Sequence, residues 1–293
     1  MPNYRIIHKT IYTYEDLVSH CLNLAHMYPL NNAHQECYRT FIDVKPRPSV
    51  SSFRKDYFGN NLFFFAIEDS HKELEITVES SVKTNVPIYS LFSRSCPWED
   101  VWERLESSKS RADIEAIEYT LPSSYVSYNS NFADYAMQSF LPGKSVLESV
   151  YDFTLRIFKE FKFDPKATTI VTPLEQVFAQ KKGVCQDFTH FAISALRSIK
   201  IPARYVSGYI ETHPPAGQEK LKGSDATHAW VSVYCPDQGW VDFDPTNGKF
   251  ITDEYIMTSV GRDYSDISPL KGILYGGGKH KLKVEVDVLR EDF

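Results

Sequence analysis

The feature that most constrains the fold of this chain is a single helical pattern followed by three strand patterns. In Val184 to Ile199, apolar side chains recur at steps of three and four residues, which indicates a helix with one apolar face. Three segments of strand character follow, at Arg204 to Ile210, His228 to Tyr234 and Gly239 to Asp244. Because an apolar helix face must be buried against another element, we expect this helix to lie across a sheet built from the three strands.

Two further helices are predicted before this unit. Ser145 opens a capping box at the start of an amphipathic pattern that continues to about Phe161. A second box begins at Thr172, and Pro173 stands where the first helical residue is expected. This box predicts a short helix that ends before Gly183. The helices and strands together indicate an α+β domain.

The first part of the chain has a different pattern. Tyr, Phe, Val and Thr are frequent up to about residue 85, and the clearest strand runs from Leu74 to Val82, with alternating apolar and polar residues. We expect a β-sandwich-like domain over residues 1–95, a helical connector over residues 96–144 and the α+β domain over residues 145–293. An alternating strand at residues 281–288 could pack with either domain.

Charge and cysteine content limit the partners and the environment. The chain has 32 basic and 38 acidic residues and a formal charge of −6, which provides no electrostatic footprint for nucleic acid or an anionic membrane. No segment approaches the length of about 18 uninterrupted apolar residues that a membrane helix needs, and no signal-peptide pattern is present. The five cysteines form no Cys-x-x-Cys pair. They are predicted to be free thiols of a cytoplasmic protein.

Cys185 differs from the other cysteines because it lies at the start of the predicted helix. Free N–H groups and the positive end of the helix dipole favour an anion there, and the thiolate is the reactive form of cysteine. The N–H of Cys185 could also stabilise an oxyanion. Asp187 is expected to favour the helix dipole, and His190 to be a packing or hydrogen-bonding residue. A free cysteine is more often a small buried hydrophobe, so this position alone does not establish a nucleophile.

A histidine and a carboxylate follow on the predicted strands. His228 begins its strand and could act as general base and acid for Cys185. Asp242 and Asp244 are two residues apart and share one strand face, so alternation does not choose between them. A proline ends this strand directly after Asp244, which leaves that carboxylate at the rim, where it could orient the imidazole. The alternative is that this aspartate only initiates a turn.

Other residues near these groups have open roles. Trp230 and Tyr209 could line an acyl-binding groove as substrate-binding residues, and they could equally be core residues. Arg204 and Arg262 could hold an acidic substrate group, although structural ion pairs are the more common role. The polar segment over residues 211–226 contains prolines and glycines and could cover the site as a lid.

Taken together, these residues resemble the transglutaminase-like superfamily, in particular its bacterial branch with an N-terminal β-rich region. The resemblance rests on the order of Cys185, His228 and Asp244 and on the strings GVCQDF, THAW and GWVDFDPTNG that contain them. It extends to TPLEQVF before the cysteine, to IPARYVSGY and GRDY after it, and to DYFGN in the N-terminal part. As an ensemble these motifs are specific, and they cover most of the chain.

The resemblance implies a papain-like α+β core in which a nucleophile helix packs on an antiparallel sheet. It implies that Cys185 is the nucleophile, His228 the base and acid, and Asp244 the orienting carboxylate, because the acid of this family directly precedes a Pro-Thr pair. No calcium loop and no paired Cys-x-x-Cys motif is found in the sequence, so neither a metal nor another cofactor is implied.

The predicted function is that of a cysteine acyl-transfer enzyme that hydrolyses peptide or amide bonds through a thioester. Its expected partner is a peptide or protein substrate. Transfer to an amine, as in protein-glutamine cross-linking, is the alternative within the same enzyme class, because the chemistry up to the thioester is shared. A non-catalytic partner-binding module on the same scaffold is the competing class. The sequence does not determine the oligomeric state.

Overall fold

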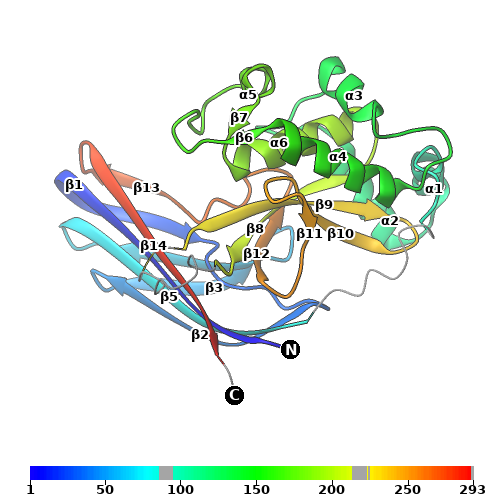
Figure 1. The fold of residues 1–293 in the computed structure, drawn as a ribbon. Helices are drawn as coiled ribbons and strands as arrows, with labels where there is room; N and C mark the ends of the chain where they lie inside the picture. The colour runs from blue at the N-terminus through cyan, green and yellow to red at the C-terminus, as the bar shows by residue number, and fades with distance from the viewer. Residues whose placement is uncertain (86–94, 213–222, 224, 292–293) are drawn as a thin grey trace, which may run out of the picture.

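A computed structural model describes residues 1–85, 95–212, 223 and 225–291 of the chain. The described elements form two large sheets, and the helices lie on one side of the smaller sheet (Figure 1). The predicted combination of a β-rich N-terminal domain with an α+β core is therefore confirmed.

The N-terminal domain is built on a seven-stranded sheet with the order β2-β5-β1-β4-β3, to which β13 and β14 add by pairing with β1. The strands are β1 (Asn3–Ala25), β2 (Gln35–Lys45), β3 (Val50–Lys55), β4 (Asn61–Ile67), β5 (His71–Thr84), β13 (Leu270–Gly276) and β14 (His280–Glu291). The first half of β1 pairs with β5 and β14, and its second half pairs with β4 and β13. The C-terminal strand therefore packs on the N-terminal sheet and not on the α+β sheet.

The expected β-sandwich-like domain is made from one hydrogen-bonded sheet rather than two separate ones. Its core brings together strands that are not neighbours in the sheet, because Val44 of β2 and Phe63 of β4 pack in one cluster. The pairing register of β1 with β5 shifts between Thr13 and Val18, near the point where β1 exchanges its partners. One long strand, β1, thus connects the strands that pair with its first half to those that pair with its second half.

The α+β domain contains a five-stranded antiparallel sheet with the order β11-β10-β9-β8-β12. Its strands are β8 (Ala203–Ile210), β9 (Thr227–Cys235), β10 (Gly239–Asp244), β11 (Lys249–Phe250) and β12 (Tyr255–Gly261). The helices are α1 (Asp100–Ser107), α2 (Arg111–Ile117), α3 (Ser130–Met137), α4 (Val146–Glu160), α5 (Leu174–Gln180) and α6 (Cys185–Ser198), with a 3-10 turn η2 at Glu118–Thr120. A short parallel pair is formed by β6 (Lys162–Phe163) and β7 (Lys182–Gly183). The predicted helix α6 and strands β8 to β10 are confirmed.

Local signals explain how two of these helices begin. The Ser145 hydroxyl accepts a backbone N–H of the first turn of α4 at 3.4 Å, as the capping box predicts. The predicted box at Thr172 is wrong in detail, because α5 begins at Leu174 and follows Pro173 without a side-chain cap. The Thr172 hydroxyl instead accepts the N–H of Thr169 at 2.9 Å and stabilises the turn that leads into the helix.

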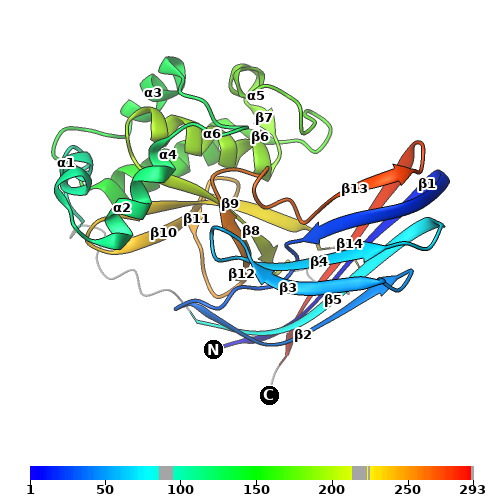
Figure 2. The ribbon, with the colours of Figure 1, turned by 180° about the vertical axis from the view of Figure 1, so that it is seen from behind.

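Both faces of the five-stranded sheet are covered. Ala229, Val231 and Val233 of β9 lie in the same core as helices α4 and α6. On the opposite face, Trp230 packs in a cluster with Leu30 of the N-terminal part. Figures 1 and 2 accordingly show the helices and the N-terminal sheet on opposite sides of this smaller sheet. Strand β9 is thus fixed from both faces, and it carries His228 near its start.

The candidate lid is described only in part. Most of the polar segment 211–226, the candidate lid, lies outside the described residues. Near its end, the Asp225 N–H donates to the Val286 carbonyl at 3.0 Å, and the Asp225 carboxylate accepts the N–H of Val288 at 2.7 Å. Two hydrogen bonds therefore join the residue just before β9 to β14.

Within the described residues, no helix has the length and apolar character required to cross a membrane.

Candidate active site

Cys185 is the first residue of α6, as the sequence predicted, and its side chain is partly exposed. Asp187 organises this helix start, because its Oδ2 accepts the N–H of Val184 at 2.8 Å and the hydroxyl of Thr168 at 2.5 Å. A Cβ at Gly183 would lie 2.6 Å from the same oxygen, so glycine is required beside this cap. Asp187 therefore fixes the first turn, in which the Cys185 N–H has no partner within the helix.

The side chains of His228 and Asp244 meet at one end of the five-stranded sheet. His228 lies near the start of β9, and Asp244 ends the antiparallel neighbour β10. His228 Nε2 donates to Asp244 Oδ2 at 2.7 Å, and both side chains are buried. Asp242 is also buried, and the charge that acts most strongly on it is that of Arg204. The structure thus pairs His228 with Asp244, whereas no hydrogen bond joins His228 to Asp242 among the described residues.

Asp244 has more partners than the sequence indicated. Its Oδ2 also accepts the Tyr255 hydroxyl at 2.6 Å and Asn247 Nδ2 at 2.7 Å. Its Oδ1 accepts the backbone N–H groups of Thr246 at 2.8 Å and Asn247 at 3.2 Å. One carboxylate therefore makes both kinds of contact that the sequence offered as alternatives, one with the backbone of the turn and one with the imidazole.

Tyr255 and Asn247 are the residues of this site that sequence reasoning missed. Asn247 lies in the turn that follows β10, three residues after Asp244. Its position in this turn could have predicted a hydrogen bond to the Asp244 carboxylate. Tyr255 comes from β12, which is separated from β10 by β9 and β8 in the sheet. No local pattern indicates such a contact.

The electrostatics of the site favour a charged imidazole. Burial alone lowers the pKa of His228, but the hydrogen bond to Asp244, the nearby thiol of Cys185 and the charges of these two groups outweigh burial and raise the pKa to about 10. Burial alone raises the pKa of Asp244, but the hydrogen bonds from His228, Tyr255 and Asn247 hold it below its usual range. Because Nε2 contacts Asp244, Nδ1 is the ring nitrogen left for the thiol. Such an imidazolium can protonate a leaving group and then accept a proton from a nucleophile.

The predicted groove residues Trp230 and Tyr209 are buried in this structure. Trp230 is 0% exposed and packs edge to face on Tyr255, with ring centroids 5.4 Å apart. Tyr209 is 2% exposed, and its hydroxyl lies 2.8 Å from His8 Nδ1. Neither side chain presents a surface on which a substrate could rest, because each is enclosed between the two domains. The core role that the sequence also allowed accounts for both.

The two arginines have structural partners. The Arg204 guanidinium lies 4.0 Å from the centroid of the Trp240 ring. Arg262 forms a bidentate ion pair with Asp266, with both nitrogen–oxygen distances at 2.9 Å. Among the described residues, no cluster of three or more His, Cys, Asp and Glu side chains is arranged to hold a metal ion.

The chain matches two protein-family models. Residues 4–83 match the bacterial transglutaminase-like N-terminal region, and residues 133–245 match the transglutaminase-like superfamily. The second match contains Cys185, His228 and Asp244, and the first covers most of strands β1 to β5.

Several relatives are similar over different lengths. An uncharacterized protein of Mycobacterium tuberculosis is 35% identical over 291 residues, which cover 98% of this chain and 92% of the relative. An uncharacterized protein of Mycobacterium leprae is 33% identical over 294 residues, which cover 98% of each chain. A protein-glutamine gamma-glutamyltransferase of Pseudomonas aeruginosa is 33% identical over 98 residues, which cover 31% of this chain and 15% of that protein.

A solved structure shares the fold over the whole length. The crystal structure of a "putative cysteine protease" from Cytophaga hutchinsonii superposes with a TM-score of 0.71 and 18% sequence identity, and the match covers 100% of this chain and 92% of that one. At this level of identity the similarity shows a common fold.

Proposed function

The chain belongs to the transglutaminase-like superfamily, and from this premise we propose that it is a cysteine acyl-transfer enzyme that hydrolyses peptide or amide bonds. The observation that carries the proposal is the hydrogen bond of His228 to the buried carboxylate of Asp244, with the thiol of Cys185 near enough to contribute to the raised pKa of His228. A partly exposed cysteine at a helix start, beside a histidine held by a buried carboxylate, is the arrangement that thiol-dependent acyl transfer requires.

The proposed reaction begins with attack of Cys185 Sγ on the carbonyl carbon of the scissile amide. The N–H of Cys185 and the positive end of α6 stabilise the negative charge that develops on the carbonyl oxygen. His228 donates its proton to the leaving nitrogen, the C–N bond breaks, and a thioester remains on Cys185. His228 then takes a proton from water, which attacks the thioester. The C–S bond breaks, the carboxylic acid is released, and the proton on His228 returns to the sulfur of Cys185.

Asp244 has the role of orienting the imidazole and stabilising its cation. Its carboxylate accepts five hydrogen bonds, from His228, Tyr255, Asn247 and the turn backbone. Because these contacts restrain both oxygens, the carboxylate does not need to reorganise when charge moves onto His228 during the reaction.

The proposed substrate is a peptide or protein, and the proposed location is the cytoplasm. All five cysteines are free thiols, which reducing compartments preserve. The formal charge of −6 offers no general attraction for nucleic acid or an anionic surface.

Amine transfer is the second candidate, and the partial similarity to a protein-glutamine gamma-glutamyltransferase favours it. The two reactions differ only in whether water or an amine attacks the thioester. A transferase must shield the thioester from water while it holds the amine. We favour hydrolysis because the side chain of Cys185 is partly exposed, which gives water access to an acyl group attached there.

Alkylation tests the nucleophile. With iodoacetamide at neutral pH, Cys185 should react much faster than the other four cysteines, and His228→Ala should slow this reaction selectively. Mass spectrometry of the digested protein gives the rate at each cysteine. Slow and equal labelling of all five would instead favour a non-catalytic binding module.

Product analysis distinguishes water from an amine as the acceptor. A glutamine-containing peptide is incubated with and without a primary amine, and the products are weighed by mass spectrometry. Hydrolysis predicts release of ammonia or of a peptide fragment even when the amine is present. Amine incorporation that outruns these products would replace hydrolysis with transfer.

A further inference from the structure

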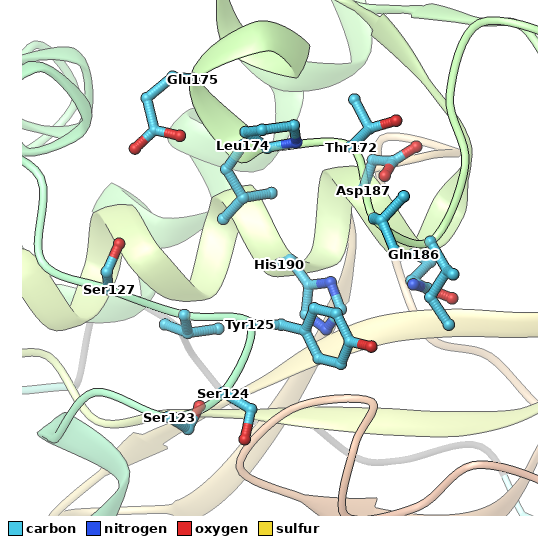
Figure 3. A pocket seen from close by; sticks show the side chains of 14 residues that line it. Ser123, Ser124, Tyr125, Ser127, Thr172, Leu174, Glu175, Gln186, Asp187 and His190 are labelled. Carbon is cyan, nitrogen blue, oxygen red and sulfur yellow. The ribbon is translucent and has the colours of Figure 1, made fainter.

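A cavity of about 230 Å³ lies beside the first two turns of α6 (Figure 3). Its lining combines the loop over residues 123–127, the segment 170–175 that leads into α5, and three side chains of α6, Gln186, Asp187 and His190. Gln186 directly follows Cys185 in the helix. The cavity therefore lies against the helix turn that carries the proposed nucleophile, although Cys185 itself is not one of the lining residues.

The lining carries negative charge and no compensating positive charge. Its fourteen residues, all within the described part of the chain, include Glu175 and Asp187 but no lysine or arginine. His190 adds no charge at neutral pH, because burial lowers its pKa to about 4. Its Nε2 accepts the N–H of Tyr264 at 3.2 Å, which also requires this nitrogen to be unprotonated. A cationic group entering the cavity would meet no like charge from the lining.

One oxygen of Asp187 is available to such a group. Asp187 is only 6% exposed, and both of its hydrogen bonds use Oδ2. Oδ1 has no hydrogen-bond partner within the part of the chain that the structure describes. A carboxylate oxygen in a mostly buried position is stabilised by a cation or a donor. Figure 3 shows Asp187 and Glu175 at separate places on the cavity wall.

One part of the cavity lining is aromatic and aliphatic. The His190 ring packs against the rings of Tyr125 and Tyr205, with ring centroids 5.3 Å and 4.9 Å away. Val126 and Leu174 add aliphatic surface to the lining. A lining that combines aromatic and aliphatic surface with carboxylates suits a side chain that has an aliphatic stem and a charged end.

We propose that this cavity is a subsite for a lysine-like side chain of a peptide substrate, with its ammonium group attracted by the negative charges of Asp187 and Glu175. The inference rests on the proposed function, since it makes the cavity part of the acyl-donor site beside Cys185. An amine acceptor fits less well, because its nitrogen must reach His228 to lose a proton, and no residue of β9 or β10 lines the cavity.

Two alkylating reagents of matched shape test the subsite. N-iodoacetyl-lysine amide and N-iodoacetyl-norleucine amide both place a side chain next to the atom that reacts with Cys185, but only the first carries an ammonium group. At low salt, wild-type Cys185 should react about five- to tenfold faster with the lysine reagent. Glu175→Gln should reduce this preference about two- to fivefold. The control Glu106→Gln, which removes an equal charge on α1, should leave it unchanged.

The outcomes separate the subsite from the nucleophile. Equal rates with the two reagents at Cys185, or a lysine preference that survives Glu175→Gln, would overturn the subsite and leave the proposed function standing. Reaction of Cys185 with both reagents at no more than the rate of the other four cysteines would overturn the proposed function and the subsite with it. Decay of a preformed acyl-enzyme that butylamine accelerates in the wild type but not in Glu175→Gln would assign the cavity to an acceptor instead.

Discussion

Two buried histidines of the α+β domain experience opposite electrostatics. His228, near the start of β9, is 8% exposed, and His190, in the second turn of α6, is 3% exposed. Burial lowers the pKa of both, yet the pKa of His228 rises to about 10 while that of His190 falls to about 4. His228 donates to the carboxylate of Asp244, whereas His190 accepts the N–H of Tyr264. The hydrogen-bond partner, more than the depth of burial, decides which ring can act as an acid.

The largest expected difference between the two histidines is in catalysis. His228→Gln should lower the turnover of p-nitrophenyl acetate by about 10²–10⁴-fold, because the thioester loses the base that activates water. His190→Gln should retain activity within about tenfold, since this ring is neutral and contacts the backbone. Steady-state release of p-nitrophenol measures both variants. Equal losses in the two variants would remove the functional distinction.

Replacing the carboxylate that pairs with His228 should make the pKa of this histidine more like that of His190. Asp244→Asn removes the largest contribution that raises the pKa of His228, so this pKa should fall from about 10 toward neutrality or below. Turnover should drop by about 10²–10⁴-fold as the imidazole loses its orienting charge. NMR titration of ¹⁵N-labelled histidine follows the pKa. Asp242→Asn, which removes the neighbouring carboxylate on β10, is the matched control and should leave the titration of His228 in place.

The two histidines should also bound the range of pH over which the fold is stable. The pKa of His228 in the folded state lies above the unfolded value of about 6.5. Its contribution to the free energy of unfolding is therefore complete below about pH 6.5 and is lost as pH rises through about 10. The folded pKa of His190 lies below the unfolded value, so stability is lost as pH falls from about 6.5 to about 4. His8 contributes in the same direction as His190, because burial lowers its pKa to about 4.

Urea unfolding at several pH values measures this effect. Between about pH 6.5 and pH 4 the free energy of unfolding should fall by a few kcal/mol, since each pKa unit corresponds to about 1.4 kcal/mol. His190→Gln should reduce this acidic loss, and Asp244→Asn should reduce the alkaline loss. An acidic loss of unchanged size in His190→Gln would contradict the neutral state assigned to that ring.

The smallest expected effect concerns the support of Asp244. Tyr255→Phe removes one hydrogen bond to Oδ2 and leaves the other four in place. It should lower the free energy of unfolding by about 1–2 kcal/mol and reduce turnover much less than Asp244→Asn does. Tyr128→Phe, which removes one hydrogen bond made by a tyrosine that is 53% exposed, should change neither quantity measurably. A loss in Tyr255→Phe as large as in Asp244→Asn would give the tyrosine a larger role than this account does.

The parts of the molecule that local pattern determines were predictable from the sequence. The start of α6 at Cys185 and strands β8 to β10 follow from apolar periodicity and from the proline after Asp244. The sequence also places Cys185, His228 and Asp244 each at the end of a helix or strand, which predicts that they lie close together. The resemblance to a family then favoured Asp244 over Asp242, and the hydrogen bond at 2.7 Å agrees with that choice.

Features that depend on long-range pairing were not predictable. Tyr255 reaches Asp244 only because β12 joins the sheet beyond β8, and β14 joins the N-terminal sheet through β1. The sequence predicts that Asp187 interacts favourably with the helix dipole, but it does not show that the carboxylate accepts the N–H of Val184 and caps the helix. Trp230 and Tyr209 were predicted as groove residues because the sequence does not show that the N-terminal domain covers their face of the sheet.

The most direct test of the central claim is to locate the acyl group after brief reaction with p-nitrophenyl acetate. The account predicts up to one acetyl group per chain, sensitive to hydroxylamine and found on the peptide that contains Cys185, with slower release in His228→Gln. Acetylation spread over lysines or other cysteines, with Cys185 unmodified, would contradict it.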